Sequence, residues 1–173
     1  MESISKLETT VATWYKSMPH LSEAGRKWLA ENVWWIALVG VILGVLGIWG
    51  ILTILFFTSA VLTGFGGIAG AAVTGVLWIA TFVGLLFSVL DLVLTGMAIN
   101  PLKAQLKKGW TLLFVVLLIN VASAVIGFLF KYNLIELIWS LLTSAAVGYF
   151  LFEIRSYFAV VRTAKKVTVK KTA

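Results

Sequence analysis

The chain has 173 residues, of which 61% are hydrophobic and 12% are charged, and its mean hydropathy is +1.03. Soluble domains carry about twice that share of charged residues, so this composition excludes an ordinary soluble domain and indicates a protein that uses lipid as its solvent. There is no cysteine and only one histidine, His20, which excludes disulfides, thiolate metal sites and cysteine nucleophiles. The net charge of +7 favours a membrane surface over nucleic acid, because the basic residues flank apolar runs and lack interleaved aromatic stacking platforms.

Residues 1–32 are expected to form a cytoplasmic interfacial segment. Apolar residues recur there at the spacings of three and four that align one face of a helix: Ile4, Leu7, Val11, Trp14 and Met18. Such a helix, stopped by Pro19, would rest in the inner headgroup layer with its apolar face toward the lipid. It is either a plain anchor, which we favour, or a slide helix that docks a partner. A second helix is expected to begin after Ser22, a plausible N-cap, and to run into the first span.

Residues 33–155 are expected to form the transmembrane domain, and residues 156–173 a basic cytoplasmic tail. About 20 apolar residues cross a hydrocarbon core of about 30 Å, and the apolar runs suffice for four crossings. The expected spans are about 33–57, 71–98, 111–130 and 134–154. The uncharged segment 51–77 is longer than two spans need. It forms either long helices joined by a glycine turn at Gly64–Gly70, which we favour, or a re-entrant hairpin.

The lysine and arginine residues predict the orientation, because basic loops stay on the cytoplasmic side. With four spans, every lysine and arginine except Lys131 faces the cytoplasm, whereas five spans would place a basic segment outside. The expected fold class is an all-α integral membrane protein, a four-helix transmembrane bundle with an N-terminal cytoplasmic interfacial amphipathic helix. Both chain ends are expected in the cytoplasm, and the membrane is the plasma membrane, or the inner membrane if the protein is bacterial.

Asp91 is the polar residue that stands out, because a carboxylate at hydrocarbon depth is costly and is a functional candidate by default. Asn120 lies at a similar depth on the next span, so a hairpin predicts a hydrogen bond between the two side chains. Small and polar residues are expected to share their helix faces: Gly84, Ser88, Thr95 and Ser123. Asp91 either carries a proton or a cation, or forms a structural clamp between helices. We favour the clamp, because a proton path normally needs more than one titratable group.

Glycines at four-residue spacing predict close helix packing, within the chain or between copies: Gly40, Gly44, Gly47, Gly66 and Gly70. The run Thr63-Gly64-Phe65-Gly66 resembles the potassium-channel selectivity filter, which is built from backbone carbonyls. It departs from that pattern because Leu62 and Thr63 stand in reversed order, and because Gly67 and apolar Ile68 follow the motif where aspartate often follows it. A glycine turn explains the same letters.

The sequence offers no Ser/His/Asp grouping, metal-ligand spacing or nucleotide-binding loop, so we expect no enzyme activity, no metal and no cofactor. Basic residues are expected to bind anionic lipid headgroups or an acidic partner: Lys103, Lys107, Lys108, Lys165, Lys166, Lys170 and Lys171. The favoured function is an accessory subunit or membrane-organising scaffold that acts through helix packing, with itself or with other membrane proteins. The alternative is a small ion channel or proton-coupled transporter that uses Asp91 or the Gly64–Gly67 segment.

Overall fold

The computed structural model describes residues 2–158, and side chains within residues 6–129 and 132–158. This part of the chain is helical and contains no strand. Its four helices, in chain order, are α1 (Glu2–Tyr15), α2 (Glu23–Lys103), α3 (Lys107–Lys131) and α4 (Leu134–Glu153). Among the described residues, α2, α3 and α4 are each long and apolar enough to cross a membrane.

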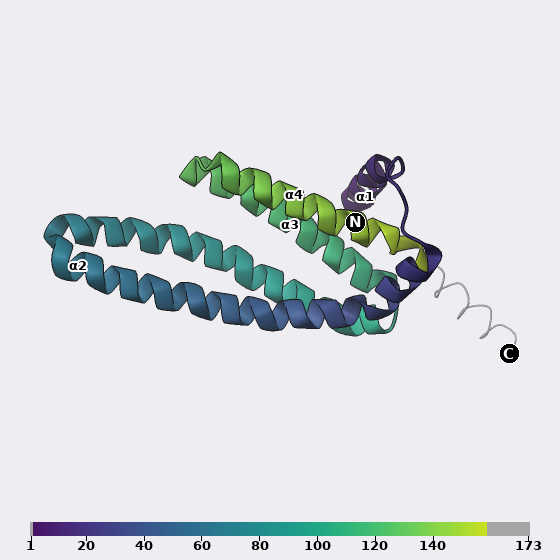
Figure 1. Cartoon of the computed structure of the whole chain (residues 1–173), viewed down its shortest axis with the longest axis horizontal. Helices are drawn as coiled ribbons and strands as arrows, with labels where there is room; N and C mark the ends of the chain where they lie inside the picture. Colours follow the sequence, from purple (N-terminus) through teal and green to yellow (C-terminus); the bar gives the residue numbers. More distant parts are fainter. Residues whose placement is uncertain (1, 159–173) are drawn as a thin grey trace, which may run out of the picture.

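The 81-residue α2 is a helical hairpin rather than one straight rod (Figure 1). Its single non-helical residue is Gly67, with φ 56° and ψ −138°. This backbone conformation is open essentially only to glycine. The chain reverses there, so residues 23–66 form the first arm and residues 68–103 form the second arm. Segment 51–77 therefore consists of long helices with a glycine turn, as favoured from the sequence, and Thr63–Gly66 is helical rather than an extended filter loop.

The two arms contact each other directly behind this turn. Gly70 lies against the backbone carbonyl of Leu62, at a distance that leaves no room for a Cβ atom. Farther from the turn, the indole N–H of Trp78 donates to Ser59 Oγ at 3.0 Å. The ring centroids of Phe56 and Trp78 lie 5.0 Å apart. These contacts tie the arms together near the turn.

The helix ends follow local chemistry. Ser22 is the N-cap of α2 as expected, because its Oγ accepts a hydrogen bond from the Gly25 N–H at 3.2 Å. Gln105, with φ 49°, turns the chain from α2 into α3. The left-handed Tyr132 ends α3, and the Asn133 side chain caps α4 by accepting from the Glu136 N–H at 3.1 Å.

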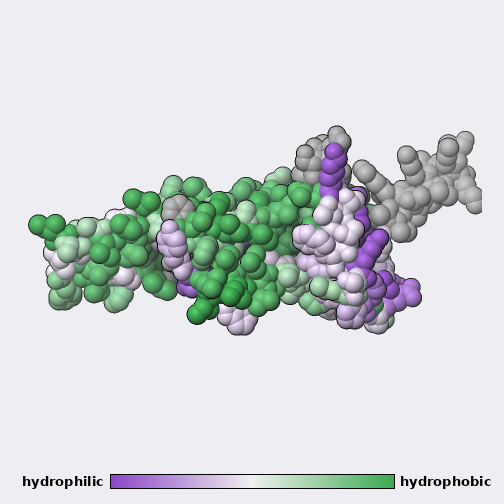
Figure 2. Space-filling model, turned by 90° about the horizontal axis from the view of Figure 1, so that it is seen from above, coloured by the Kyte–Doolittle hydropathy of each residue, from purple (hydrophilic) through white to green (hydrophobic). Residues whose placement is uncertain are grey.

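The buried core lies at one end of the molecule, where both arms of α2 meet α3 and the C-terminal end of α4. Trp110, Phe114 and Phe158 are its largest fully buried side chains. Hydrophilic residues gather on the surface at this same end, whereas most of the remaining visible surface is hydrophobic (Figure 2). We call this the basic end, because Arg26, the residues around Lys107, and Arg155 lie there.

The helices form an open row rather than the four-helix bundle expected from the sequence. Among the described helices, α3 packs against both α2 and α4, whereas α2 and α4 share few contacts (Figure 1). A bundle requires each helix to close onto two neighbours, and α4 reaches α2 only around the core of the basic end. The first two expected spans correspond to the two arms of α2, which are joined at Gly67.

The N-terminal helix ends at Tyr15, four residues before Pro19, and packs against α4. The expected apolar stripe is not its packed face, since Leu7, Trp14 and Met18 are 48%, 66% and 45% exposed. Glu8, which is only 4% exposed, faces the protein instead. The apolar stripe is therefore exposed while α1 docks on α4 through polar contacts, and the location of the stripe in the headgroup layer stays a prediction.

Candidate functional site

The expected polar pair comes together between the second arm and α3. Asn120 donates from Nδ2 to Asp91 Oδ1 at 3.4 Å and to the carbonyl of Val116, one turn earlier, at 3.0 Å. Thr95 also lies within hydrogen-bonding reach of Asp91. The contact to Asp91 is at the long end of the hydrogen-bond range, so the pair is in place without being tightly closed.

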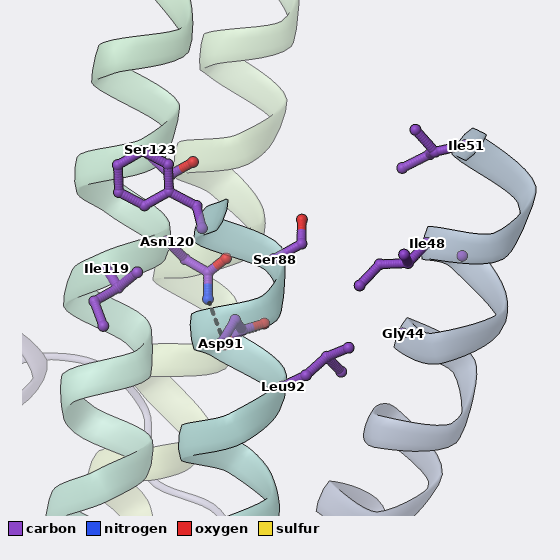
Figure 3. Close-up of a pocket in the computed structure, with 11 residues that line it drawn as sticks. Gly44, Ile48, Ile51, Ser88, Asp91, Leu92, Ile119, Asn120 and Ser123 are labelled. Carbon is purple, nitrogen blue, oxygen red and sulfur yellow. Dashed lines mark hydrogen bonds between the residues drawn. The ribbon is translucent and has the colours of Figure 1, made fainter. Parts of the chain in front are cut away.

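Asp91 and Asn120 line a cavity of about 210 Å³, which we call the polar pocket (Figure 3). Its walls come from both arms of α2 and from α3. Leu92 and Ile48 reach into the space between the arms in Figure 3. The remaining lining residues are Gly44, Gly47, Ile51, Phe87, Ser88, Ile119 and Ser123. A carboxyl, an amide and two hydroxyl groups therefore share one small space otherwise walled by apolar side chains.

The other expected polar-face residues differ in their roles. Ser88 and Ser123 line the polar pocket, but Ser88 Oγ donates to the carbonyl of Gly84 at 3.0 Å. That bond satisfies the hydroxyl within its own helix. Gly84 is exposed, and a Cβ atom there would meet nothing within 4 Å.

The glycines expected at helix contacts divide in the same way. A Cβ atom at Gly44 would collide with the Leu92 side chain, and one at Gly70 would collide with the Leu62 carbonyl. At Gly40, Gly47 and Gly66 it would meet nothing within 4 Å. Only two of the five glycines therefore permit close approach of described helices, and for Gly40, Gly47 and Gly66 a role in packing between copies stays a prediction.

Two of the expected lipid-binding lysines contact other side chains, one through an aromatic ring and one through an ion pair. Lys103 places its ammonium 5.1 Å from the Trp34 ring centroid, and Lys107 Nζ lies 3.5 Å from Glu8 Oε1. Lys108 is exposed. The tail lysines lie outside the described residues: Lys165, Lys166, Lys170 and Lys171.

A second group of polar residues, which sequence reasoning missed, lies at the basic end. Arg155, which follows α4, places Nε and Nη2 each 2.7 Å from Glu8 Oε1. The Glu8 side chain is only 6% exposed, so its charge is held by Arg155 and Lys107 rather than by water. The pairing joins residues 147 positions apart.

Glu153 forms the other half of this group. Its Oε2 accepts from the Leu21 N–H at 3.0 Å and lies 3.9 Å from Arg26 Nε, and its Oε1 lies 2.6 Å from His20 Nδ1. The Glu153 side chain is 5% exposed. This carboxylate therefore fixes the segment between α1 and α2 against the end of α4. We call the set the ionic cluster: Glu8, His20, Arg26, Lys107, Glu153 and Arg155.

Tyrosine and tryptophan hydrogen bonds surround the ionic cluster. The hydroxyl of Tyr15 donates to the Ala145 carbonyl at 3.1 Å, and that of Tyr149 donates to the Pro19 carbonyl at 2.6 Å. Burial raises the pKa of Tyr15 above its usual value, because the phenolate would lose hydration there. The buried indole of Trp110 donates to the Leu151 carbonyl at 2.7 Å.

The spacing of residues carried a weak signal for the ionic cluster. Glu8, Val11, Ala12 and Tyr15 share a helix face by the three-and-four rule, and all four are at least partly buried. The predicted stripe lies beside that face. The apolar pattern predicted the stripe as the functional face of the helix. Glutamate is rarely buried without a charged partner, and the partner of Glu8 is remote in the sequence.

The described residues offer limited chemistry. No group of three or more histidine, cysteine, aspartate or glutamate side chains among them could hold a metal ion. Fold and sites together define an all-helical protein with three helices apolar enough to cross a membrane, a polar pocket between helices and an ionic cluster at one end. Comparison with protein families, with curated proteins and with solved structures finds no match.

Proposed function

We propose that the chain crosses the membrane four times, with each arm of α2 making one crossing and both chain ends in the cytoplasm. The basic end then faces the cytoplasm, in line with the tendency of lysine and arginine to stay there. The turn at Tyr132–Asn133 and the tip of the α2 hairpin lie on the opposite side. The plasma membrane, or the bacterial inner membrane, is the compartment that this arrangement fits.

The absence of cysteine makes this topology simple to test. Single cysteines replacing Gln105, Tyr132 and Lys170 would be labelled in intact cells with a thiol reagent that does not cross membranes. We expect only the cysteine at position 132 to be labelled from outside. Labelling of positions 105 and 170 from opposite sides would refute the four-span arrangement.

We further propose that the protein is an accessory subunit or scaffold that assembles with another membrane polypeptide. The observation that carries this proposal is the length of the α2 hairpin. Between Val33 and Ile99 the arms carry no charge except Asp91, and each measures about 50 Å at about 1.5 Å per residue. The hydrocarbon core is about 30 Å thick. At the average helix tilt of about 20°, each arm still spans about 47 Å.

The extra length of the α2 hairpin lies beyond the end of α3. Asp91 and Asn120 are level with each other, and from that level α3 continues for about 17 Å while the second arm continues for about 36 Å. The α2 hairpin visibly extends past the end of α3 and α4 (Figure 1). We call residues 57–80 the hairpin tip. Its surface is apolar, with Phe57 72%, Phe65 92% and Ile68 92% exposed. An apolar surface of this kind marks a binding surface when lipid does not cover it.

Site-specific photo-crosslinking in native membranes tests this proposal. A photoreactive amino acid at Phe65 is expected to capture a polypeptide, either another protein or a second copy. The control is the same residue at Ile135, which is 71% exposed but lies level with the end of α3. Ile135 is expected to label lipid. If both positions label lipid alone, the hairpin tip is embedded in the bilayer and the scaffold proposal fails.

The polar pocket favours a second candidate, a small channel or transporter for protons or cations. Asp91 and Asn120 provide an acid and an amide between helices, in a cavity large enough for several water molecules. In proteoliposomes, Asp91→Asn is expected to abolish a proton flux, because asparagine keeps the hydrogen-bonding shape and cannot titrate. Absence of flux in the unaltered protein, together with unchanged assembly in Asp91→Asn, would leave the clamp as the role of Asp91.

A further inference from the structure

A second cavity, of about 340 Å³, opens beside the ionic cluster at the basic end. Its polar lining consists of His20, Arg26, Lys107, Glu153, Arg155 and Ser156, and its apolar lining consists of Trp110 and Phe152. We propose that this headgroup cavity binds the phosphate of an anionic phospholipid. The inference rests on the membrane placement proposed above, but it does not depend on assembly with a partner.

The arrangement of charge favours an anion. Three permanent cations line the headgroup cavity, and they come from the start of α2, the start of α3 and the chain beyond α4. The two glutamates that pair with them, Glu8 and Glu153, have side chains only 6% and 5% exposed. Arg26, Lys107 and Arg155 remain 34%, 46% and 36% exposed. Glu8 therefore lies behind the cations, whereas Glu153 also lines the cavity. Three permanent cations face this one carboxylate, and they leave an excess positive charge toward the opening.

Arg26 supplies a donor that the described part of the chain does not satisfy. Its Nε atom is buried and has no hydrogen-bond acceptor among the described residues. The nearest carboxylate oxygen, Glu153 Oε2, is 3.9 Å away, beyond hydrogen-bonding distance. Buried donors are nearly always satisfied, so this atom indicates an acceptor that enters from the cavity. A phosphate oxygen has the charge and geometry that a guanidinium prefers.

The start of α3 adds a further attraction for an anion. No side chain caps this helix at Leu106. Uncapped N–H groups in a first helical turn carry partial positive charge and attract phosphate. Lys107 and Trp110, which lie in that first turn, both line the headgroup cavity. The dipole and the cations therefore act on the same space.

A phospholipid fits the cavity better than a free anion does. Phe152, backed by the buried Trp110, provides an apolar wall next to the charged groups, as the junction between a headgroup and its glycerol backbone requires. The cavity lies at the basic end, beside the buried core. Basic pockets between helices at this level of a membrane bind anionic headgroups.

The test uses the full purified chain in a zwitterionic or neutral detergent, with three probes: phosphatidylglycerol, phosphatidylcholine and inorganic phosphate. Native mass spectrometry is expected to show phosphatidylglycerol retained on the chain, and a thermal scan is expected to show a higher Tm with that lipid. Phosphatidylcholine should produce neither effect. An equal Tm rise with inorganic phosphate alone would overturn the lipid assignment in favour of a soluble anion.

Two variants and one control locate the binding. Arg26→Gln is expected to weaken phosphatidylglycerol retention at least fivefold. Lys27→Gln removes the same charge from the neighbouring exposed position, outside the cavity lining, and is expected to retain binding. Equal losses in both variants would overturn the proposal, because they would indicate non-specific attraction. Ser156→Trp fills the cavity without changing charge, so it tests the site even if Arg26→Gln fails to fold, and unchanged lipid binding in Ser156→Trp would also overturn it.

Crosslinking from the hairpin tip provides a separate readout. Loss of lipid binding in Ser156→Trp with unchanged crosslinking at Phe65 would support the headgroup cavity independently of the scaffold proposal. Failure of crosslinking with retained lipid binding would reject the scaffold alone.

Discussion

Around Trp110, side chains from α2, α3 and the end of α4 are almost completely buried, whereas Phe65 and Ile68 at the hairpin tip are each 92% exposed. The basic end also satisfies most of its polar groups, through ion pairs, tyrosine hydroxyls and a tryptophan N–H. At the hairpin tip, the Trp78–Ser59 bond and the Gly70–Leu62 approach are the main contacts between the arms. The comparison teaches that the chain stabilises one end by itself and leaves the other end for lipid or a partner to cover.

The largest expected effect on stability compares a substitution at the basic end with one at the hairpin tip. Trp110→Ala removes a fully buried ring and the hydrogen bond to Leu151, so it should lower the free energy of unfolding by about 3–5 kcal/mol. Phe65→Ala should change it by less than about 0.5 kcal/mol, because the ring has few neighbours to lose. Unfolding by SDS in mixed micelles measures both. Similar losses in the two variants would show that the hairpin tip is packed in the isolated chain.

The next effect tests the ionic cluster. Arg155→Met leaves Glu8 buried with only Lys107 nearby, and is expected to lower the free energy of unfolding by about 2 kcal/mol. This is less than the about 3–5 kcal/mol usual for a broken buried ion pair, because Lys107 remains and Arg155 is partly hydrated. The double variant Glu8→Met with Arg155→Met should recover most of the loss, because no unpaired charge is left. The same SDS titration provides the measurement, with Lys108→Met as the control. A double variant less stable than Arg155→Met would contradict this account.

The hairpin turn should show a smaller effect. Gly67→Ala places a Cβ atom on a backbone with φ 56° and ψ −138°, and is expected to cost about 1–2 kcal/mol. The matched control is Gly64→Ala, where the backbone is helical and a Cβ atom meets nothing. That change should stabilise by up to about 1 kcal/mol, since alanine favours helix. If Gly67→Ala is as stable as Gly64→Ala, the chain does not reverse at Gly67.

The smallest effect concerns the polar pocket. Asn120→Ala removes the bond to Asp91, and is expected to cost about 0.6 kcal/mol, the average for polar contacts between membrane helices. Ser123→Ala, in the same pocket, is the control and should be neutral within error. A loss of more than about 2 kcal/mol for Asn120→Ala would show that the pair is a principal clamp between the second arm and α3.

Much of the fold could be read from local pattern. Helical content and apolar stretches follow from composition and hydropathy, because lipid and backbone hydrogen bonding select helices from such runs. The approach of Asp91 and Asn120 follows from counting residues along two helices that meet at a basic turn. The turn was expected within Gly64–Gly70, and the structure places it at Gly67. The backbone angles identify Gly67 as the turn residue, and the sequence alone does not give those angles.

The local sequence pattern did not predict the ionic cluster. Glu8 and Arg155 are 147 positions apart, and His20 and Glu153 are 133 apart. These ion pairs form only because α1 folds back onto α4. The sequence of α1 does not show which of its two candidate faces contacts α4. The open row of helices is likewise a product of packing.

The amino-acid sequence by itself determined that this chain is helical, apolar enough for membranes and reversed at a glycine turn, because these properties depend on neighbouring residues and on solvent. Only the tertiary structure decided which face of α1 is buried, which glycines touch a neighbour and which cations share a cavity. Those outcomes depend on distances between segments remote in the chain, and such distances are set by packing.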